Sequence, residues 1–258
     1  MKNKILLGID VEEFDLPEEY GQEITEELKL NITLKGLGIL NKILDNHQIR
    51  VTFFTTAYWA SHFPNMIKEF SQKHEIASHT FYHSSFKLED LHLSRKKLQE
   101  ISGQEIYGVR MPRMKTVDLK IINSAGYVYD SSLHPTWIPG RYNNLKKKRK
   151  IFKSENIYEI PISVTPILRI PVFWLAFKNF NFSFYKYLCK QILAKNGYLV
   201  LYFHPWEFTE LSSFKLPKMI RRLDGNAMTD RMNKLIEFLK NLGEFQTHVD
   251  FINSQLTE

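Results

Sequence analysis

The sequence predicts a parallel α/β fold, and three observations lead to this class. Short runs of apolar and β-branched residues alternate with amphipathic segments over most of the 258 residues. The runs are almost continuously apolar, as in strands that are covered on both faces. Ionisable residues stand directly after several of the runs. No linker, internal repeat or low-complexity tract interrupts the pattern, so we expect residues 1–258 to form a single domain.

The predicted strands are residues 5–11, 51–55, 75–78, 107–110, 127–129, 158–164 and 198–203. Amphipathic segments lie between them. Leu37, Leu40 and Leu44 fall on one helical stripe, and Leu91 and Leu98 fall on another beside a charged face. Strand and helix therefore alternate in chain order.

Composition limits the class of protein. Apolar residues make up 43% of the chain and aromatic residues 14%, which is enough for a core and argues against disorder. The single cysteine, Cys189, cannot form an internal disulfide, so nothing requires an oxidising compartment. The apolar stretch at the N-terminus is too short for a signal peptide and ends at Asp10. We therefore expect a cytoplasmic protein, either free in the cytoplasm or at the inner membrane surface.

The formal charge is +7, and much of it lies in one basic run, residues 146–150. A solvated loop is the simplest interpretation. The alternative is a patch for anionic lipid headgroups or sugar phosphates, which would give peripheral membrane contact. We expect no nucleic-acid partner, because no nucleic-acid-binding motif accompanies the charge.

Residues 157–177 are apolar enough to suggest a membrane span. Pro161, Pro166 and Pro171 interrupt the stretch, and each proline removes a backbone donor, so a spanning helix is not expected. An aromatic cluster follows. Core packing is its default explanation, and an apolar groove suited to a lipid-linked sugar is the alternative. Its members are Phe173, Trp174, Phe177, Phe180, Phe182, Phe184, Tyr185 and Tyr187.

Polar groups gather at the ends of the predicted strands. The carboxyl ends of the strands in a parallel barrel share one face, which carries the active site. Each group alone has a structural explanation, such as a helix cap, a surface ion pair or a turn, but together they indicate a site. The groups are Asp10 and Glu12, His79 and His83, Arg110, Asp130, and His204.

His79 and His83 are spaced so that both imidazoles can face one cation. With a carboxylate such as Glu12, two histidines are a common ligand set for a hydrolytic metal. Because i and i+2 on a strand point to the same side, Glu12 can join Asp10 if the first strand continues.

The strand-end motifs resemble those of the polysaccharide deacetylases, the family with the NodB homology domain (carbohydrate esterase family 4). The blocks are Gly8-Ile-Asp-Val-Glu12, Val51-Thr-Phe-Phe54, Glu75-Ile-Ala-Ser-His79 with His83, Arg110-Met-Pro112, Tyr129-Asp-Ser-Ser132 and Phe203-His-Pro-Trp-Glu207. The first and last blocks are most similar to the subgroup associated with exported polysaccharides. The resemblance implies a distorted, incomplete (β/α) barrel of about seven parallel strands, a divalent metal, and hydrolysis of an N-acetyl group on a sugar.

The resemblance also implies roles. Most members begin with two adjacent aspartates, whereas Val11 separates Asp10 from Glu12 here. Glu12, His79 and His83 are the implied metal ligands, for zinc most readily and otherwise cobalt, nickel or iron. Asp10 is the implied base, held by Arg110. His204 is the implied acid, oriented by Asp130. We also expect Trp206, Tyr82 and Pro112 to contact the substrate.

Three other functions stay open. One is a metal-independent amidohydrolase of small ureido or cyclic amides on the same barrel. Another is an iron oxygenase, which also uses two histidines and a carboxylate but does not require Asp10 and His204. The third is a non-catalytic carbohydrate-binding barrel. The sugar, its chain length, its linkage to lipid and the oligomeric state are not indicated by the motifs.

Overall fold

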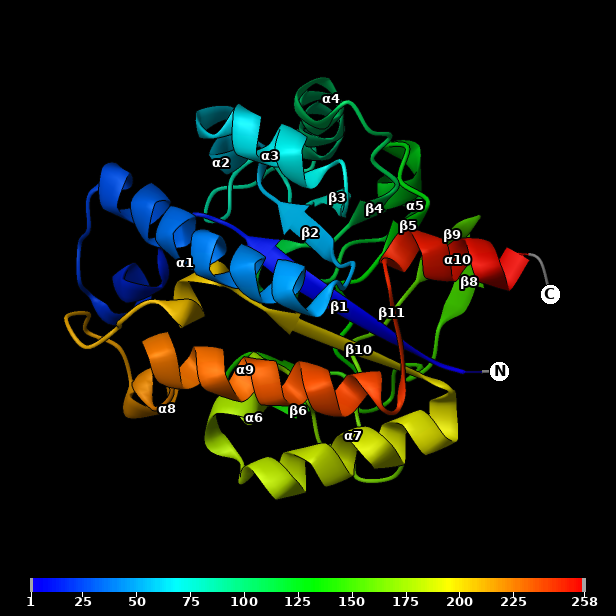
Figure 1. Cartoon of the computed structure of the whole chain (residues 1–258). Coiled ribbons are helices and arrows are strands. Elements are labelled where there is room, and N and C mark those ends of the chain that lie inside the picture. Colours follow the sequence, from blue (N-terminus) through cyan, green and yellow to red (C-terminus); the bar gives the residue numbers. More distant parts are fainter. Residues whose placement is uncertain (1, 257–258) are drawn as a thin grey trace.

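Strand β1, Asn3–Val11, has neighbouring strands on both of its edges. A computed structural model describes residues 2–256 and shows β1 paired in parallel with β10, Tyr198–Phe203, on one side (Figure 1). On the other side its first half pairs with β11, Gly243–Gln246, and its second half with β2, Thr52–Thr55. The strand that carries Asp10 is therefore fixed on both edges.

The remaining strands extend the sheet in the order β10-β1-β2-β3-β4-β5-β9-β8. All pairings in this order are parallel except that of β8 with β9. Their bounds are β3 Glu75–Ser78, β4 Gly108–Val109, β5 Tyr129–Asp130, β8 Phe152–Ser154 and β9 Ile157–Glu159; β6 Trp137–Ile138 and β7 Tyr142–Asn143 form a separate antiparallel pair. All seven predicted strand regions contribute to the sheet.

The sheet is curled but does not close into a complete barrel, because β8 and β10 are its two ends. The chain after β9 bridges part of this gap. The Ser163 N–H donates to the Val200 carbonyl at 3.1 Å, and the Val200 N–H donates to the Ser163 hydroxyl oxygen at 2.8 Å. The result is a distorted, incomplete barrel, with an extended segment where the sequence predicts a strand to residue 164.

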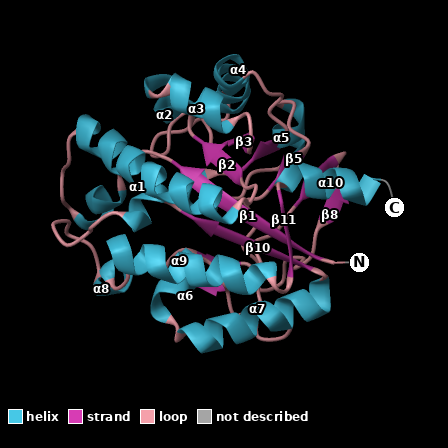
Figure 2. Ribbon diagram, viewed as in Figure 1, coloured by secondary structure: helices cyan, strands magenta, loops and turns pink. Residues whose placement is uncertain are grey.

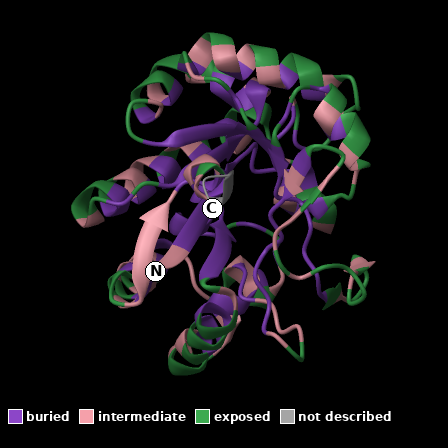
Figure 3. Ribbon diagram, turned by 90° about the vertical axis from the view of Figure 1, so that its right-hand side faces the viewer, coloured by how far each residue is buried: buried purple, intermediate pink, exposed green. Residues whose placement is uncertain are grey.

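Helices cover the outside of the curled sheet (Figure 2). They are α1 Glu26–His47, α2 Ala57–His62, α3 Pro64–Phe70, α4 Asp90–Ser102, α5 Leu119–Ser124, α6 Trp174–Asn179, α7 Phe182–Asn196, α8 Lys218–Arg221, α9 Gly225–Lys240 and α10 His248–Leu256, with 3-10 turns η1 Leu16–Tyr20, η2 Pro112–Met114 and η3 Pro205–Phe208. The predicted stripe of Leu37, Leu40 and Leu44 is buried, as are Leu91 and Leu98. Figure 3 shows the buried strands inside helices whose outer faces are exposed.

The stretch 157–177 contains β9, irregular chain and the start of α6. Within residues 2–256, no helix combines the length and hydropathy that crossing a membrane requires. The aromatic cluster divides. Phe177 and Tyr185 lie in the core, Phe173, Trp174 and Phe180 line a cavity, and Phe184 and Tyr187 are exposed. Core packing therefore explains part of the cluster, and another part lines a cavity.

Gly36 lets helix α1 approach turn η3, which follows β10. A Cβ at residue 36 would overlap the carbonyl of Pro205, whereas a Cβ at Gly38 of the same helix meets nothing within 4 Å. We expect Gly36→Ala to lower the free energy of unfolding by about 1–3 kcal/mol, because an overpacked contact forces the backbone to shift.

Gly38→Ala is the matched control. It should raise the stability by up to about 1 kcal/mol, since alanine is the better helix former. Urea unfolding followed by circular dichroism measures both values. Equal effects of the two substitutions would contradict the close approach of α1 to η3.

Candidate active site

The predicted site residues lie at one edge of the sheet. Asp10 is near the end of β1, His79 directly follows β3, Arg110 follows β4, Asp130 ends β5, and His204 follows β10. All five side chains are buried. Parallel pairing brings these strand ends together, although they are far apart in the sequence.

Glu12, His79 and His83 form a cluster that can hold a metal ion. One ligand atom from each lies within 4.8 Å of the others. Glu12 Oε2 is 3.1 Å from Nε2 of His79 and 3.1 Å from Nε2 of His83. The other carboxylate oxygen, Oε1, accepts a hydrogen bond from Trp206 Nε1 at 3.2 Å. The two oxygens thus have separate partners.

Hydrogen bonds at the far side of both rings fix which nitrogen faces Glu12. Nδ1 of His79 donates to the Arg110 carbonyl at 2.7 Å, and Nδ1 of His83 donates to Asp15 Oδ2 at 2.8 Å. A carbonyl cannot donate, so Nδ1 of His79 carries the hydrogen. Metal-ligating histidines usually donate their other N–H in this way. The donor set fits a divalent cation bound through two Nε2 atoms and a carboxylate.

The charges of the cluster depend on one another. Burial alone would raise the pKa of Glu12, but the positive charges of His83 and His204 hold it well below its ordinary value. Burial opposes charge on His83 as well, yet the Glu12 and Asp15 carboxylates raise its pKa to about 9. When no cation is bound, a proton on His83 therefore lies between His83 and Glu12. A cation can take the place of this proton.

Asp10 is held by a buried guanidinium. Arg110 Nη1 donates to Asp10 Oδ1 at 2.6 Å, while its Nε and Nη2 donate to the Ser131 carbonyl and hydroxyl, each at 3.1 Å. The Arg110 side chain is fully buried and lies over the Phe54 ring at 3.9 Å. This fixed fork orients one carboxylate oxygen of Asp10 and leaves the other for a proton.

The expected partner of His204 is not the one that the structure shows. Nδ1 of His204 donates to Glu207 Oε1 at 3.0 Å, and the His204 backbone N–H donates to the same oxygen at 2.8 Å. Asp130 instead accepts from the Ser132 hydroxyl and interacts with Glu159, its neighbour across β5 and β9. The assignment of Asp130 to His204 is thus replaced by Glu207, because turn η3 folds this side chain back onto the ring.

The two buried carboxyl groups of Asp130 and Glu159 share their surroundings. Burial and the charge of Asp130 raise the pKa of Glu159 well above its ordinary value. Glu159 also accepts the Leu133 backbone N–H at 3.1 Å. Each carboxyl group thus favours the protonated form of the other, and the pair joins β5 to β9 beside Arg110.

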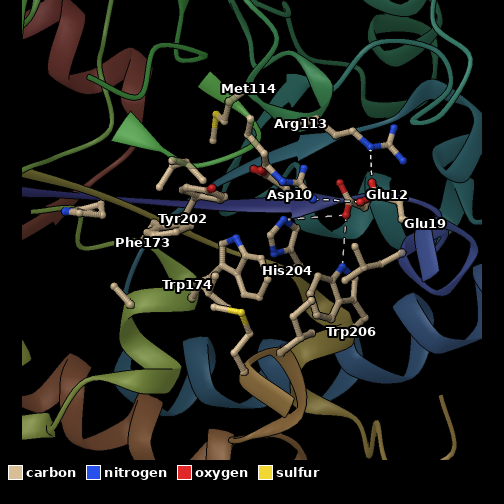
Figure 4. Close-up of a pocket in the computed structure, with 18 of the residues that line it drawn as sticks. Asp10, Glu12, Glu19, Arg113, Met114, Phe173, Trp174, Tyr202, His204 and Trp206 are labelled. Carbon is tan, nitrogen blue, oxygen red and sulfur yellow. Dashed lines mark hydrogen bonds and ion pairs between the residues drawn. The ribbon is translucent and has the colours of Figure 1, made fainter. Parts of the chain in front are cut away.

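A buried lysine lies behind Glu207. Lys178 Nζ is 3.9 Å from Glu207 Oε2, and both side chains are fully buried. Burial lowers the pKa of Lys178, against the opposing charge of Glu207. His204 lies between Trp174 and Trp206, with ring centroids 5.3 and 4.8 Å away (Figure 4). Although burial disfavours its charge, Glu12 and Glu207 raise the pKa of His204.

A cavity of about 560 Å³ opens onto these groups. Asp10, Glu12, His79, His83 and His204 line it, and so does Trp206. Most of the remaining lining is apolar and includes Leu16, Met111, Met114, Ile138, Phe173, Trp174, Leu175, Phe180, Tyr202, Met219 and Ile220. A ligand that reaches the polar groups also contacts a large apolar surface.

Two residues expected to contact substrate do not line this cavity. Tyr82 turns its ring toward Tyr58, at 5.2 Å between centroids, and is partly exposed to solvent. Pro112 begins turn η2, since a proline fits the first position of such a turn. Its side chain is buried. Trp206 does line the cavity, but its indole N–H contacts Glu12 instead of presenting only an apolar wall.

Asp15 and Glu207 are functional candidates to which the motifs assign no role. Asp15 lies after β1 and also accepts from Arg113 Nη2 at 3.2 Å, and no sequence spacing relates it to His83. The role of Glu207 could have been predicted from the sequence, because this residue stands three residues after His204, at the spacing of a capping interaction.

Two family models match the chain. The model described as polysaccharide deacetylase matches residues 39–129, and the model described as a domain of unknown function (DUF3473) matches residues 131–253. The first match contains His79, His83 and Arg110, and the second contains His204 and Glu207. No curated protein matches the sequence.

Several solved structures are similar to this chain. One is a Mycobacterium smegmatis protein assigned to the polysaccharide deacetylases, with 18% identity, coverage of 91% of this chain and 84% of that one, and a TM-score of 0.58. PuuE allantoinase has 17% identity, coverage of 96% and 88%, and a TM-score of 0.59. A CE4 family pseudoenzyme from Bacillus anthracis has 11% identity, coverage of 96% and 65%, and a TM-score of 0.53. These likenesses confirm the predicted fold class.

Metal binding at this cluster should depend on pH. The raised pKa of His83, about 9, means that a cation must displace a proton from Nε2 below that pH. The affinity for zinc should therefore rise about tenfold per pH unit between about pH 6.5 and about pH 8, because one proton leaves per ion bound. Chelator competition measures this slope. An affinity that does not change over this range would contradict protonation of His83.

Proposed function

The chain belongs to the polysaccharide deacetylase family, and on this premise we propose that it is a metal-dependent hydrolase that removes N-acetyl groups from an amino sugar in a polysaccharide or glycolipid precursor. The predicted enzyme class, a deacetylase hydrolase that acts on C–N bonds, is confirmed by the family match. The observation that carries the proposal is the Glu12, His79 and His83 cluster in one cavity with Asp10 and His204.

Amide hydrolysis needs an activated water, stabilisation of the carbonyl oxygen and a proton for the leaving amine. A divalent cation held by Glu12, His79 and His83, most readily zinc, supplies Lewis acidity for the first two needs. The protein's own groups must then move the protons. Asp10 and His204 are buried, line the cavity and lie on neighbouring strand ends, which suits a base and an acid that act on one amide.

Asp10 is the proposed general base. An aspartate has a reference pKa of about 3.9 and is a weak base for free water, but it suffices where a cation makes the water more acidic. The bond from Arg110 at 2.6 Å fixes one oxygen, so the proton goes to the other. Charge-assisted bonds of this kind restrict both the orientation and the ionisation of a carboxylate.

His204 is the proposed general acid. Glu207 accepts from Nδ1, which leaves Nε2 as the atom that gives a proton to the departing amine. The raised pKa of His204 keeps the ring protonated closer to neutral pH than a free imidazole. Glu207, with Lys178 behind it, therefore acts as a positioning residue for the acid.

The cavity supports a substrate with an apolar part. Its lining beside the polar groups is mainly apolar, and Arg113 and Arg141 add two guanidinium groups, both bonded to Glu19 at 2.6 and 3.0 Å. An N-acetylated sugar linked through phosphate to a lipid matches this combination of sugar, anion and hydrocarbon. We propose such a lipid-linked substrate, in a cytoplasmic enzyme at the inner membrane surface.

We also propose that residues 1–258 form one catalytic domain. Strand β1 pairs with β2 from the first part of the chain and with β10 and β11 from the last part. His79 and His204 accordingly reach the same cavity although the two family models divide between them.

Acetate release tests the function. Purified protein is incubated with an acetamido oligosaccharide or its lipid-linked form, before and after removal of metal with a chelator. We expect chelation to abolish the release of acetate and zinc to restore it. Asp10→Asn should lower the rate by about 10²- to 10⁴-fold while metal stays bound.

The other functions predict different results. Activity on a cyclic ureide that survives complete metal removal would favour the metal-independent amidohydrolase. Binding of the sugar without any acetate would favour the non-catalytic barrel. Either outcome, or full activity of metal-loaded Asp10→Asn, would contradict the proposal.

The role of Glu207 is tested against that of Asp130. Glu207→Gln should lower kcat by about 10- to 100-fold and shift the alkaline limb of the pH–rate profile downward, because the acid loses a carboxylate partner. Asp130→Asn, in an equally buried position, should alter stability more than the pH profile. If Asp130→Asn moves the profile and Glu207→Gln does not, the assignment is wrong.

A further inference from the structure

Two large aliphatic side chains stand exposed at the tip of a short turn, residues 164–171. Val164 and Pro171 pair in antiparallel fashion at its base. The Thr165 N–H donates to the Ile170 carbonyl at 3.0 Å. At the tip, Ile167 is 89% exposed and Leu168 is 76% exposed, the highest values among large hydrophobic side chains of the described residues. A formed turn therefore holds these side chains in solvent.

Hydrogen bonds of Arg169 connect this tip to the basic run. Its Nη1 donates to the Lys147 carbonyl at 3.0 Å and to the Pro135 carbonyl at 3.3 Å, and its own carbonyl accepts from the Thr136 hydroxyl at 2.7 Å. The apolar tip and residues 146–150 thus lie side by side, although about twenty residues separate them in the chain.

The basic run beside the tip carries positive charge. Lys146, Lys147, Lys148 and Lys150 are exposed, and none forms an ion pair with any carboxylate of residues 2–256. Beside them, Trp137 on β6 is 57% exposed. Lysines around protruding aliphatic and tryptophan side chains are the composition of a surface that lies on anionic lipid.

The same face adjoins the cavity. Ile138 and Tyr142, on the β6–β7 pair that begins with Trp137, line the cavity, and so does Pro171 at the base of the turn. A partner surface that contacts the tip would therefore lie next to residues that line the cavity.

We propose that this face docks on an anionic membrane surface, with Ile167 and Leu168 inserted among the headgroups and the lysines of residues 146–150 against lipid phosphates. The proposal does not depend on the catalytic function. A second copy that docks through this same face is a poor occupant, because it would bring the same positive charge to the contact. A bilayer with anionic lipid offers both hydrocarbon and negative charge.

Vesicle co-sedimentation tests the docking with the full chain. We expect binding to vesicles that contain phosphatidylglycerol, weak binding to phosphatidylcholine alone, and loss of binding at high salt. The double substitution Ile167→Ser with Leu168→Ser should weaken the apparent affinity about tenfold or more. Neutralising Lys146, Lys147 and Lys150 to glutamine should weaken it about fivefold per lysine.

Matched controls lie around helices α3 and α4. Leu88→Ser with Leu93→Ser removes apolar side chains that are 45% and 53% exposed, and Lys68→Gln with Lys96→Gln removes exposed charge. Both controls should bind vesicles as the wild type does. No binding to anionic vesicles, or equal losses in the control variants, would overturn the proposal. So would a dimer in sedimentation equilibrium that the Ile167 and Leu168 substitutions abolish, since the tip would then serve self-association.

Discussion

The site depends on one contact, the Glu12 carboxylate against the Nε2 atoms of two histidines. Hydrogen bonds from Nδ1 to the Arg110 carbonyl and to Asp15 turn the Nε2 atom of each imidazole toward Glu12 Oε2, at 3.1 Å. Two electron-rich atoms at this separation repel unless a positive charge lies between them. A proton on His83 meets that need in part, and a divalent cation would meet it for both rings at once.

The surrounding structure stabilises charged groups that burial would otherwise disfavour. Arg110 is completely buried, and its partner Asp10 compensates it; removing one partner of such a pair typically costs about 3–5 kcal/mol. Trp206 holds the second oxygen of Glu12, and turn η3 brings Trp206 to it only because Gly36 has no side chain. Stability and chemistry therefore rest on the same few residues, so a packing change far from the cavity can alter the ligand set.

Much of this arrangement follows from local pattern. The strands could be predicted because apolar runs and the ionisable groups after them are visible in one chain, and parallel pairing then brings Asp10, His79 and His204 to one edge. Strand β11 was missed because Gly243–Gln246 is only half-buried and has no apolar run. Asp15 and Glu159 gain their roles from contacts between distant segments, which no spacing encodes. Tyr82 does not line the cavity, because proximity in sequence to His83 does not fix the direction of its ring.

The metal content of two neighbouring variants tests the central contact most directly. Elemental analysis compares the wild type with Glu12→Gln and with Glu13→Gln, an adjacent buried glutamate that accepts a hydrogen bond from Thr56 and lies outside the cluster. We expect about one divalent ion per chain in the wild type and in Glu13→Gln, and a large loss in Glu12→Gln, because an amide replaces the charged ligand. Full metal content in Glu12→Gln, or no metal in the wild type, would contradict the account.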